Sequence, residues 1–461
     1  MISPLPPIRL KLTDELLKRT ISRCPVCHVP CPGEVWRTGG IPSKVLLKRT
    51  CPEHGEASVC IASDARFYWL SKGKEENACG CGPGGCCSAD GSTPGTLGRN
   101  ADPGDALGVM EKLATCLCLI EIVHSCNLSC PTCYADSPMG VNQKVNAVPL
   151  AELQQRIQGV VDRKGKIEIL QLSGGEPTLH PQFFELLRWL QAHPHIDCVL
   201  LNTNGVRIAH DDAFAHELAA TFRYGRFQLY LQFDGPQAAG QTFLRGADLR
   251  ATRERCLDRC QDMKLPVNLA MTVTPENLPH LWDAVAFGLQ RPNVRGICFQ
   301  PMFGSGRTPG ALPARINSAD IILAAVAQSS GQLCFDDFTP LPCGDPNCAI
   351  IGYLLKIGGQ IRSVSDFIDF KNVQDFLGSK VRYKLEDLMK CGCESEPLGR
   401  LLKEFEMDES HTFRLFIKPF MDAGTWDEDR IDRCCTHVIR PDGKLDSFCR
   451  YYSGFADKAV T

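Results

Sequence analysis

Short apolar runs alternate with longer amphipathic stretches between residues 117 and 301. The short runs are typical of buried β-strands, and the longer ones repeat apolar residues every three or four positions, as helices that cover a sheet do. The predicted strands are residues 117–123, 167–172, 199–202, 228–233, 267–273 and 296–300. The predicted helices are residues 150–164, 181–191, 212–222, 249–263 and 278–289. This alternation predicts an α/β fold with a parallel sheet, either doubly wound or curled into a partial barrel, with its chemistry at the carboxyl ends of the strands.

The flanking sequence suggests further parts, because a chain of 461 residues is too long for one ordinary core. We expect a metal-knuckle module over residues 1–75, a Cys- and Gly-rich linker over 76–115, the α/β part over 116–305 and a C-terminal extension over 306–461.

Composition and charge narrow the possible partners. The content of 44% hydrophobic and 22% charged residues is that of a soluble globular protein. The net charge of −3 and the absence of a dense Lys/Arg block give no indication of a nucleic-acid partner, so none is expected. The longest apolar runs, such as residues 321–327, are much shorter than the roughly 20 residues that cross a bilayer, and no signal peptide follows Met1. We therefore expect a cytoplasmic protein without a transmembrane segment. Peripheral contact with a membrane is compatible with this expectation.

Cysteine is the unusual residue, at 26 positions. Without an export signal the thiols are expected to be reduced, so metal binding explains their number better than disulfides do. Most occur in groups, at residues 24–60, 79–87, 116–133, 343–348, 391–393 and 434–449. Five isolated cysteines in apolar or helical stretches are expected to be small buried side chains; these are Cys198, Cys256, Cys260, Cys298 and Cys334.

Three of the cysteines directly follow the first predicted strand. Cys126, Cys130 and Cys133 have the spacing that suits three irons of a [4Fe–4S] cluster. Such a cluster normally has four Cys ligands, so one iron would stay open to a ligand that is not protein. A zinc knuckle or a loose trio of buried thiols is the alternative interpretation of the triplet taken alone.

Polar motifs follow the next three strands. The second strand ends in Ser-Gly-Gly-Glu-Pro, where two glycines allow a close backbone approach to a ligand and the carboxylate of Glu176 suits an ammonium group. Taken alone, this motif favours a tight turn capped by Glu176. Short polar side chains at the next two strand ends suit hydroxyl and carboxylate groups, although they are also common in turns; these are Asn202, Asn204, Gln232 and Asp234.

The cluster loop and the strand-end motifs, in this order, resemble those of the radical SAM superfamily over residues 117–301. The resemblance implies a partial (β/α)6 barrel in which S-adenosylmethionine (SAM) chelates the open iron. It also implies an adenine-facing backbone edge at residues 297–301. The side chains and backbone that it assigns to SAM binding are those of Tyr134, Gly174, Gly175, Glu176, Pro177, Asn202, Asn204, Gln232 and Asp234.

A metal site is predicted near the N-terminus. Cys24 and Cys27 are followed by Cys51 and His54, the pattern of a zinc-ribbon or rubredoxin-like pair of knuckles with four ligands. If Cys31 or Cys60 were the fourth ligand instead of His54, the site would be all-sulfur and could hold iron. A closed four-ligand site indicates a structural metal.

Two further cysteine groups are candidates for auxiliary iron–sulfur clusters. The first lies in the linker, for which a flexible Cys-rich segment is the alternative; its members are Cys79, Cys81, Cys86 and Cys87. Cys116 and Cys118 are expected to share one face of the first strand and to join this group. The second lies near the C-terminus, where a Pro-Asp-Gly-Lys turn should bring paired strands together; its members are Cys343, Cys348, Cys434, Cys435 and Cys449.

Motifs along nearly the whole chain resemble the tetraether-lipid-synthase and class D radical SAM methylase group. They are CPVC, CPEHG, CNLSCPTCYA, LSGGEPTLHP, PCGDPNC and the PFMD, RCCTH, PDGK and FC elements of the C-terminal part. The resemblance implies that SAM is cleaved to a 5′-deoxyadenosyl radical, which activates an sp³ carbon of a lipid or pterin-like substrate for C–C bond formation or methylation. It implies a reductant such as flavodoxin or ferredoxin. Asp422 and His437 are candidate acid/base or substrate-contact residues, although a His beside paired cysteines is equally consistent with a structural role.

Two alternative functions stay open at this point. Auxiliary clusters in a C-terminal extension also occur in peptide-modifying radical SAM maturases. A non-catalytic iron–sulfur scaffold or electron-transfer protein is the other alternative, but the polar strand ends disfavour it because an electron carrier needs no such pocket.

Overall fold

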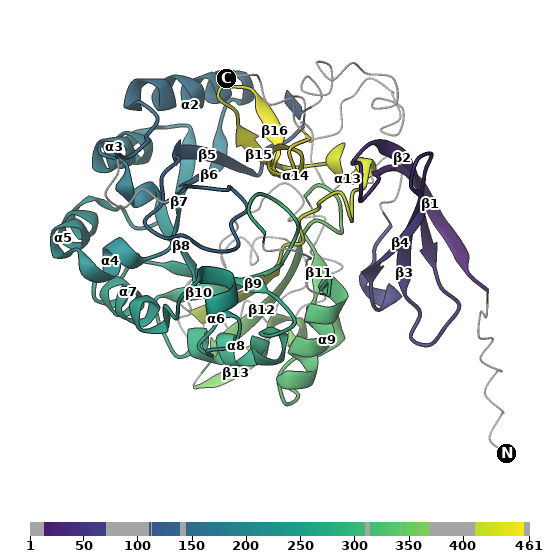
Figure 1. Ribbon diagram of the computed structural model, residues 1–461. Coiled ribbons are helices and arrows are strands. Elements are labelled where there is room, and N and C mark those ends of the chain that lie inside the picture. Colours follow the sequence, from purple (N-terminus) through teal and green to yellow (C-terminus); the bar gives the residue numbers. More distant parts are fainter. Residues whose placement is uncertain are drawn as a thin grey trace.

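The computed structural model describes residues 13–70, 110–111, 113–138, 144–308, 314–341, 343–357, 359–367 and 411–455. Figure 1 shows a small N-terminal sheet beside a larger α/β body whose strands curl around an interior.

Six parallel strands form the centre of the larger body. They are β5 (Leu117–Val123), β6 (Ile167–Gly174), β7 (Ile196–Thr203), β8 (Phe227–Gln232), β9 (Val267–Val273) and β10 (Val294–Pro301). Each strand pairs with the next one along the chain. A doubly wound sheet would reverse its strand order at a switch point. The sequential order, and the curled arrangement in Figure 1, therefore confirm the partial (β/α)6 barrel.

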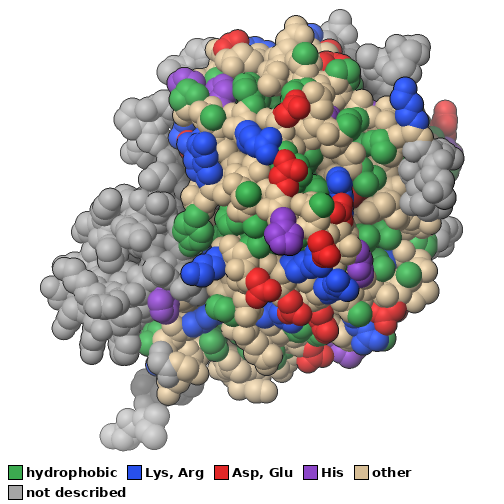
Figure 2. All heavy atoms as spheres, turned by 90° about the vertical axis from the view of Figure 1, so that its left-hand side faces the viewer, with side chains coloured by type: hydrophobic (Ala, Val, Ile, Leu, Met, Phe, Trp, Pro, Cys, Tyr) green, Lys and Arg blue, Asp and Glu red, His purple; other side chains and the backbone are tan. Residues whose placement is uncertain are grey.

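Helices cover the outer face of this barrel, and polar side chains line its interior. In β8, the buried Phe227, Leu229 and Leu231 alternate with half-buried Gln228, Tyr230 and Gln232, so one set packs under the helices while the other faces inward. The helices are α2 (Leu150–Lys164), α3 (Phe183–Ala192), α4 (Val206–His210), α5 (Asp212–Thr221), α6 (Gln241–Arg245), α7 (Arg250–Asp262), α8 (Leu281–Leu289) and α9 (Ser318–Gln328). Figure 2, a view of the helical side, shows Lys/Arg and Asp/Glu side chains interspersed.

The C-terminal part adds strands to both edges of the barrel. β14 (Thr412–Ile417) pairs in parallel with β10, and β15 (Thr436–Ile439) pairs in parallel with β5. Residues 418–435 therefore connect one edge of the barrel to the other. The remaining elements of this part are β11 (Thr339–Pro340), β12 (Ile350–Ile357), β13 (Gln360–Ser363), β16 (Leu445–Ser447), α13 (Glu428–Ile431) and α14 (Phe448–Tyr452). The strands described after residue 305 thus extend the barrel sheet, and the predicted turn forms between β15 and β16.

The N-terminal sheet is antiparallel and docks on the segment that connects the barrel edges. Its strands are β1 (Glu15–Arg23), β2 (Pro30–Arg37), β3 (Val45–Cys51) and β4 (Gly55–Ala62). The Lys18 ammonium lies 2.6 Å from the Asp427 carboxylate, to which Thr20 donates a hydrogen bond of 2.8 Å. Arg49 donates to the backbone oxygen of Gly424 at 2.8 Å.

Four of the five isolated cysteines are buried, as predicted. The prediction is wrong for Cys334, which is exposed because it lies at the surface just before the 3-10 turn Phe335–Asp337. Within the described ranges, no helix has the length and apolar character needed to cross a bilayer.

Candidate active site

A cavity of about 320 Å³ lies inside the barrel, between interior strand residues and the loops at the strand ends. Cys126, Cys130 and Cys133 line it, so the structure brings the three predicted cluster ligands to one space. Cys116 and Cys435 also line it. The cavity therefore reaches from the cluster loop to the C-terminal cysteines.

The cluster loop is fixed by the segment that follows β10. Arg307 and Cys133 exchange two backbone hydrogen bonds of 2.9 Å, and the Arg307 side chain donates to the backbone oxygen of Cys130 at 2.9 Å. The sulfur of Cys126 accepts from the backbone N–H of Leu128 at 3.4 Å and lies 3.8 Å from Nδ2 of Asn204. N–H groups directed at sulfur suit the charge of thiolates bound to iron. The donor set of this loop therefore fits an iron–sulfur cluster.

The two glycines at the end of β6 pack against the start of the cluster loop. A Cβ atom on Gly174, whose φ is 114°, would lie 2.1 Å from the backbone oxygen of Val123. A Cβ atom on Gly175 would lie 2.1 Å from the backbone oxygen of Ser125. Both glycines also line the cavity. The absence of a side chain therefore allows close backbone packing under the loop and a close approach of the backbone to a ligand.

Glu176 is buried at the same end of the cavity. One carboxylate oxygen accepts from Thr178 and from the hydroxyl of Thr203 at 2.7 Å, while the other accepts from the backbone N–H of Asn204 at 2.8 Å. Burial raises the pKa of Glu176 above its ordinary value, although these hydrogen bonds act in the opposite direction. The second oxygen keeps capacity for one more donor, as an ammonium group would provide. Pro177 is buried but does not line the cavity.

Tyr134, Asn202 and Asn204 line the cavity and are held by other side chains. The Tyr134 hydroxyl lies 3.1 Å from Ser173 Oγ and accepts from Asn202 at 3.3 Å. The Asn204 amide donates to Asn127 Oδ1 at 2.6 Å, so it braces the cluster loop. These contacts orient the side chains before any ligand is present.

Asp234 has a different role from the expected ligand contact. It is fully buried and does not line the cavity. Its carboxylate binds the guanidinium of Arg245 at 2.6 and 2.9 Å. Burial opposes ionisation, but the charge of Arg245 outweighs it, and the pKa of Asp234 lies below its ordinary value. Asp234 is thus a positioning residue for Arg245, which does line the cavity, as does Gln232.

The sequence analysis missed Arg245 and Arg253. Arg245 lies in α6 beside Cys130. Arg253 lies in α7, is 1% exposed and donates through Nε to the backbone oxygen of Gln232, while Nη1 and Nη2 have no partner. Neither belongs to a recognisable motif, because both reach the cavity from helices outside the barrel. A buried guanidinium with unused donors on a cavity wall suits an acceptor group of a ligand.

The two candidate acid/base residues lie outside the cavity. Asp422 is buried and accepts from the backbone N–H of Gly304 at 2.6 Å and from Arg315 at 2.9 Å. His437 is buried, with Nε2 donating to the backbone oxygen of Cys434 at 3.1 Å and Nδ1 lying 2.9 Å from the Thr115 hydroxyl. Burial lowers the pKa of His437 to about 3. Both residues hold chain segments together, which favours structural roles for them over the predicted acid/base roles.

The N-terminal knuckles bring four ligand atoms together. Those of Cys24, Cys27, Cys51 and His54 all lie within 4.8 Å of one another. Cys31 packs against Cys24 and Cys51 but is not part of this group. The three sulfurs and one imidazole fit a tetrahedral structural metal.

Cys51→Ser is expected to remove about one equivalent of metal per chain and to make the N-terminal sheet sensitive to protease. Structural zinc contributes free energy on the order of 10 kcal/mol to the folding of such modules. Metal content by mass spectrometry and limited proteolysis measure both effects. Cys60→Ser is the matched control, because Cys60 is half-buried on β4 outside the ligand group. If Cys60→Ser loses the metal and Cys51→Ser keeps it, the proposed ligand set is wrong.

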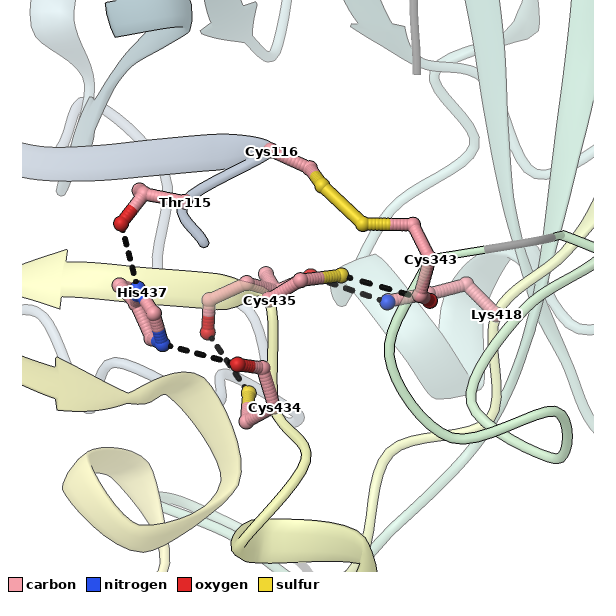
Figure 3. Close-up of a disulfide and its surroundings, with 8 residues drawn as sticks. Thr115, Cys116, Cys343, Lys418, Cys434, Cys435 and His437 are labelled. Atoms are coloured by element: carbon pink, nitrogen blue, oxygen red, sulfur yellow. Dashed lines mark hydrogen bonds between the residues drawn. A yellow bond between two sulfur atoms is a disulfide. The ribbon is translucent and has the colours of Figure 1, made fainter. Parts of the chain in front are cut away.

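The C-terminal cysteines form a second group, and it includes Cys116. Cys116, just before β5, is joined to Cys343 by a disulfide, and the sulfur of Cys435 lies within 4.8 Å of both (Figure 3). The expectation of reduced thiols is therefore wrong for this pair. The Cα atoms are 7.4 Å apart, wider than the usual span of a disulfide. Three thiols at these positions fit a metal or cluster once the disulfide is reduced.

The other cysteines of this group lie close by. Burial is the largest cause that raises the pKa of Cys434, and the nearby thiols of Cys435, Cys348 and Cys449 raise it further. Cys118 is not part of the group, because it lies one residue inside β5 and packs in the main core. The expectation that Cys116 and Cys118 serve one site is therefore wrong. The linker group lies outside the described residues; its members are Cys79, Cys81, Cys86 and Cys87.

Comparison with known families identifies two parts of the chain. Residues 120–288 match the model of the Radical SAM superfamily. Residues 16–63 match the HMPTM N-terminal zinc ribbon domain. The radical SAM domain implies a [4Fe–4S] cluster and SAM, and the ribbon and the extra cysteines fit a structural metal and an auxiliary cluster.

Individual proteins are similar over different shares of the chain. A 7,8-dihydro-6-hydroxymethylpterin dimethyltransferase of Methanocaldococcus jannaschii is 24% identical over 496 residues, which cover 94% of this chain and 93% of the relative. The mycofactocin maturase MftC of Mycobacterium ulcerans is 28% identical over 174 residues, which cover 37% of this chain and 43% of the maturase. Among solved structures, SuiB of Streptococcus suis has a TM-score of 0.38 at 15% identity, and the match covers 51% of this chain and 54% of SuiB.

Proposed function

We propose that this chain, which is a radical SAM enzyme, methylates an sp³ carbon of a reduced pterin. The observation that carries the proposal is the extent of similarity to the pterin dimethyltransferase, which includes the ribbon, the barrel and the C-terminal part. The similarity to the peptide maturase covers 37% of the chain. Only the similarity to the pterin dimethyltransferase, of these two, extends over the parts of the chain outside the six-stranded barrel. This favours a pterin over a peptide as the substrate.

When bound, a [4Fe–4S] cluster with SAM would supply the radical chemistry that activates an sp³ C–H bond of the substrate. Cys126, Cys130 and Cys133 would hold the cluster. Glu176 offers buried negative charge to the ammonium group of SAM, and Arg245, oriented by Asp234, offers positive charge to a carboxylate. Opposite charges at the two sides of the loop suit a zwitterionic ligand.

The barrel walls would exclude water and hold the target carbon near the cluster loop. The proposed electron source is a flavodoxin or ferredoxin. The cysteines at the other end of the cavity, Cys116 and Cys435, fit an auxiliary cluster that borders the substrate.

The test is an anaerobic reaction with 7,8-dihydro-6-hydroxymethylpterin, SAM and dithionite, followed by mass spectrometry. The expected products are 5′-deoxyadenosine and a pterin heavier by one or two methyl groups. Because SAM is the only one-carbon source in this reaction, methyl-deuterated SAM should give a pterin that carries three deuterium atoms for each added methyl group. Formation of 5′-deoxyadenosine without any change in pterin mass would overturn the pterin proposal and favour a peptide substrate.

A further inference from the structure

The two sides of the barrel cavity differ in chemistry. On β5 to β7 the lining includes the apolar Leu119, Ile169 and Leu200, beside the polar Gln171 and Asn202 nearer the strand ends. On β8 to β10 it is lined by the amide wall, which we define as Gln228, Tyr230, Asn268 and Gln300. All four members of the wall are half-buried strand residues that face the interior.

The members of the amide wall are held in pairs. Asn268 donates through Nδ2 to Gln228 Oε1 at 3.0 Å, and Gln300 donates through Nε2 to the Tyr230 hydroxyl at 3.0 Å. These bonds fix the side chains and leave the amide nitrogen of Gln228 as a donor. They also leave the amide oxygens of Asn268 and Gln300 as acceptors. The wall therefore presents both hydrogen-bond donors and acceptors to the cavity.

A cationic side chain adds a further donor to this part of the cavity. Arg414 of β14 lines the cavity and is half-buried. Among the residues that the structure describes, no hydrogen bond or ion pair is found for its guanidinium. Its position on the strand that pairs with β10 places it next to the amide wall.

On β8 and β9 the wall extends below the cluster loop, whereas Gln300 pairs in register with Thr272 near the strand ends. Gln228 and Asn268 are each four residues before the inward-facing Gln232 and Thr272 near the ends of their strands. Four residues of a strand span about 13 Å. A ligand bound to these amides would thus lie along the barrel axis, with its opposite end near the strand ends.

We propose that the amide wall and Arg414 recognise the amino-oxo edge of a flat heterocycle, the pyrimidinone ring of a pterin, and that the apolar side packs against the ring face. The inference rests on the proposed function and adds the residues that select the substrate. The ring edge carries N–H donors and a carbonyl acceptor, which complement the acceptors and donors of the wall. A lipid tail would leave the remaining donors and acceptors of the wall without partners in the cavity, which costs free energy, so the wall disfavours a lipid substrate.

The test measures binding to the intact reconstituted protein under anaerobic conditions. Isothermal titration with 7,8-dihydro-6-hydroxymethylpterin, in the presence of SAM, is made on the wild type and on Gln228→Leu/Asn268→Leu. We expect the double variant to bind the pterin at least about tenfold more weakly, because two neutral hydrogen bonds are lost and their partners are left unpaired. Its SAM affinity and iron content should equal those of the wild type.

Matched variants separate recognition from folding. Gln155→Leu makes the same change on the exposed face of α2 and should leave pterin affinity unchanged. Arg414→Gln keeps a polar side chain but removes the charge, and it should weaken pterin binding if the double variant fails to fold. If Arg414→Gln and every folded wall variant bind the pterin as tightly as the wild type does, the recognition role is wrong and the proposed function still stands. No pterin binding by the wild type, despite normal SAM binding, would overturn the proposed substrate and the inference with it.

Discussion

Cys130→Ala is expected to abolish 5′-deoxyadenosine formation. The cluster loop supplies three thiolates, and loss of one leaves two protein ligands for a cluster that normally has four. Changes to outer-shell partners of metal ligands already cost about 10- to 100-fold, so removal of a ligand should exceed that range. Anaerobic SAM cleavage with dithionite, measured by chromatography of the nucleosides, gives the activity.

Iron content and electron paramagnetic resonance of the reduced protein show whether the cluster itself is lost. The matched control is Cys334→Ala, the same change at an exposed thiol outside the cavity. It should keep wild-type cleavage. Equal cleavage by Cys130→Ala and the control would mean that the thiol of Cys130 does not bind the cluster.

Gly175→Ala is expected to lower SAM cleavage by about 100-fold. The new Cβ would lie 2.1 Å from the backbone oxygen of Ser125 and 2.7 Å from that of His124, both closer than real Cβ contacts. Since backbone atoms are the obstacle, the cluster loop must move relative to β6. A displacement of about 1 Å at a reacting centre costs roughly 100-fold in rate. The assay is the same nucleoside measurement, with cluster absorbance recorded on each sample.

Gly159→Ala is the control for this variant. Gly159 lies within α2, where the added Cβ would meet only the flexible end of Arg163 at 3.2 Å. Alanine is the better helix former by about 1 kcal/mol, so this variant should be slightly more stable and fully active. Wild-type cleavage by Gly175→Ala would show that the close packing under the cluster loop is not required.

The strands and helices of the barrel and the cluster loop could be predicted because their signals are local. Inward and outward residues alternate within each strand, as in β8, and the helices that cover the sheet carry their own apolar stripes. Cys126, Cys130 and Cys133 belong to one loop, so their spacing along the chain already limits their spacing in space. The two metal knuckles at the N-terminus also lie in short turns, at the ends of β1 and β3.

The second cysteine group could not be assigned in this way. Cys116 and Cys343 are 227 residues apart, and Cys435 joins them because β15 pairs in parallel with β5. No local sequence pattern predicts a parallel pairing between distant segments. The same holds for Arg245 and Arg253, whose positions on the cavity wall depend on how α6 and α7 pack against the barrel.

The sequence by itself determined the six strands with their helices, the cluster loop and the two N-terminal knuckles, because periodicity and short spacing act within a few residues, and the family resemblance added the barrel. Only the tertiary structure decided that the C-terminal strands pair with both barrel edges. It likewise decided that Asp234 serves Arg245, and that His437 and Asp422 lie away from the cavity. The physical reason is that these features depend on long-range strand pairing and on which buried charges meet.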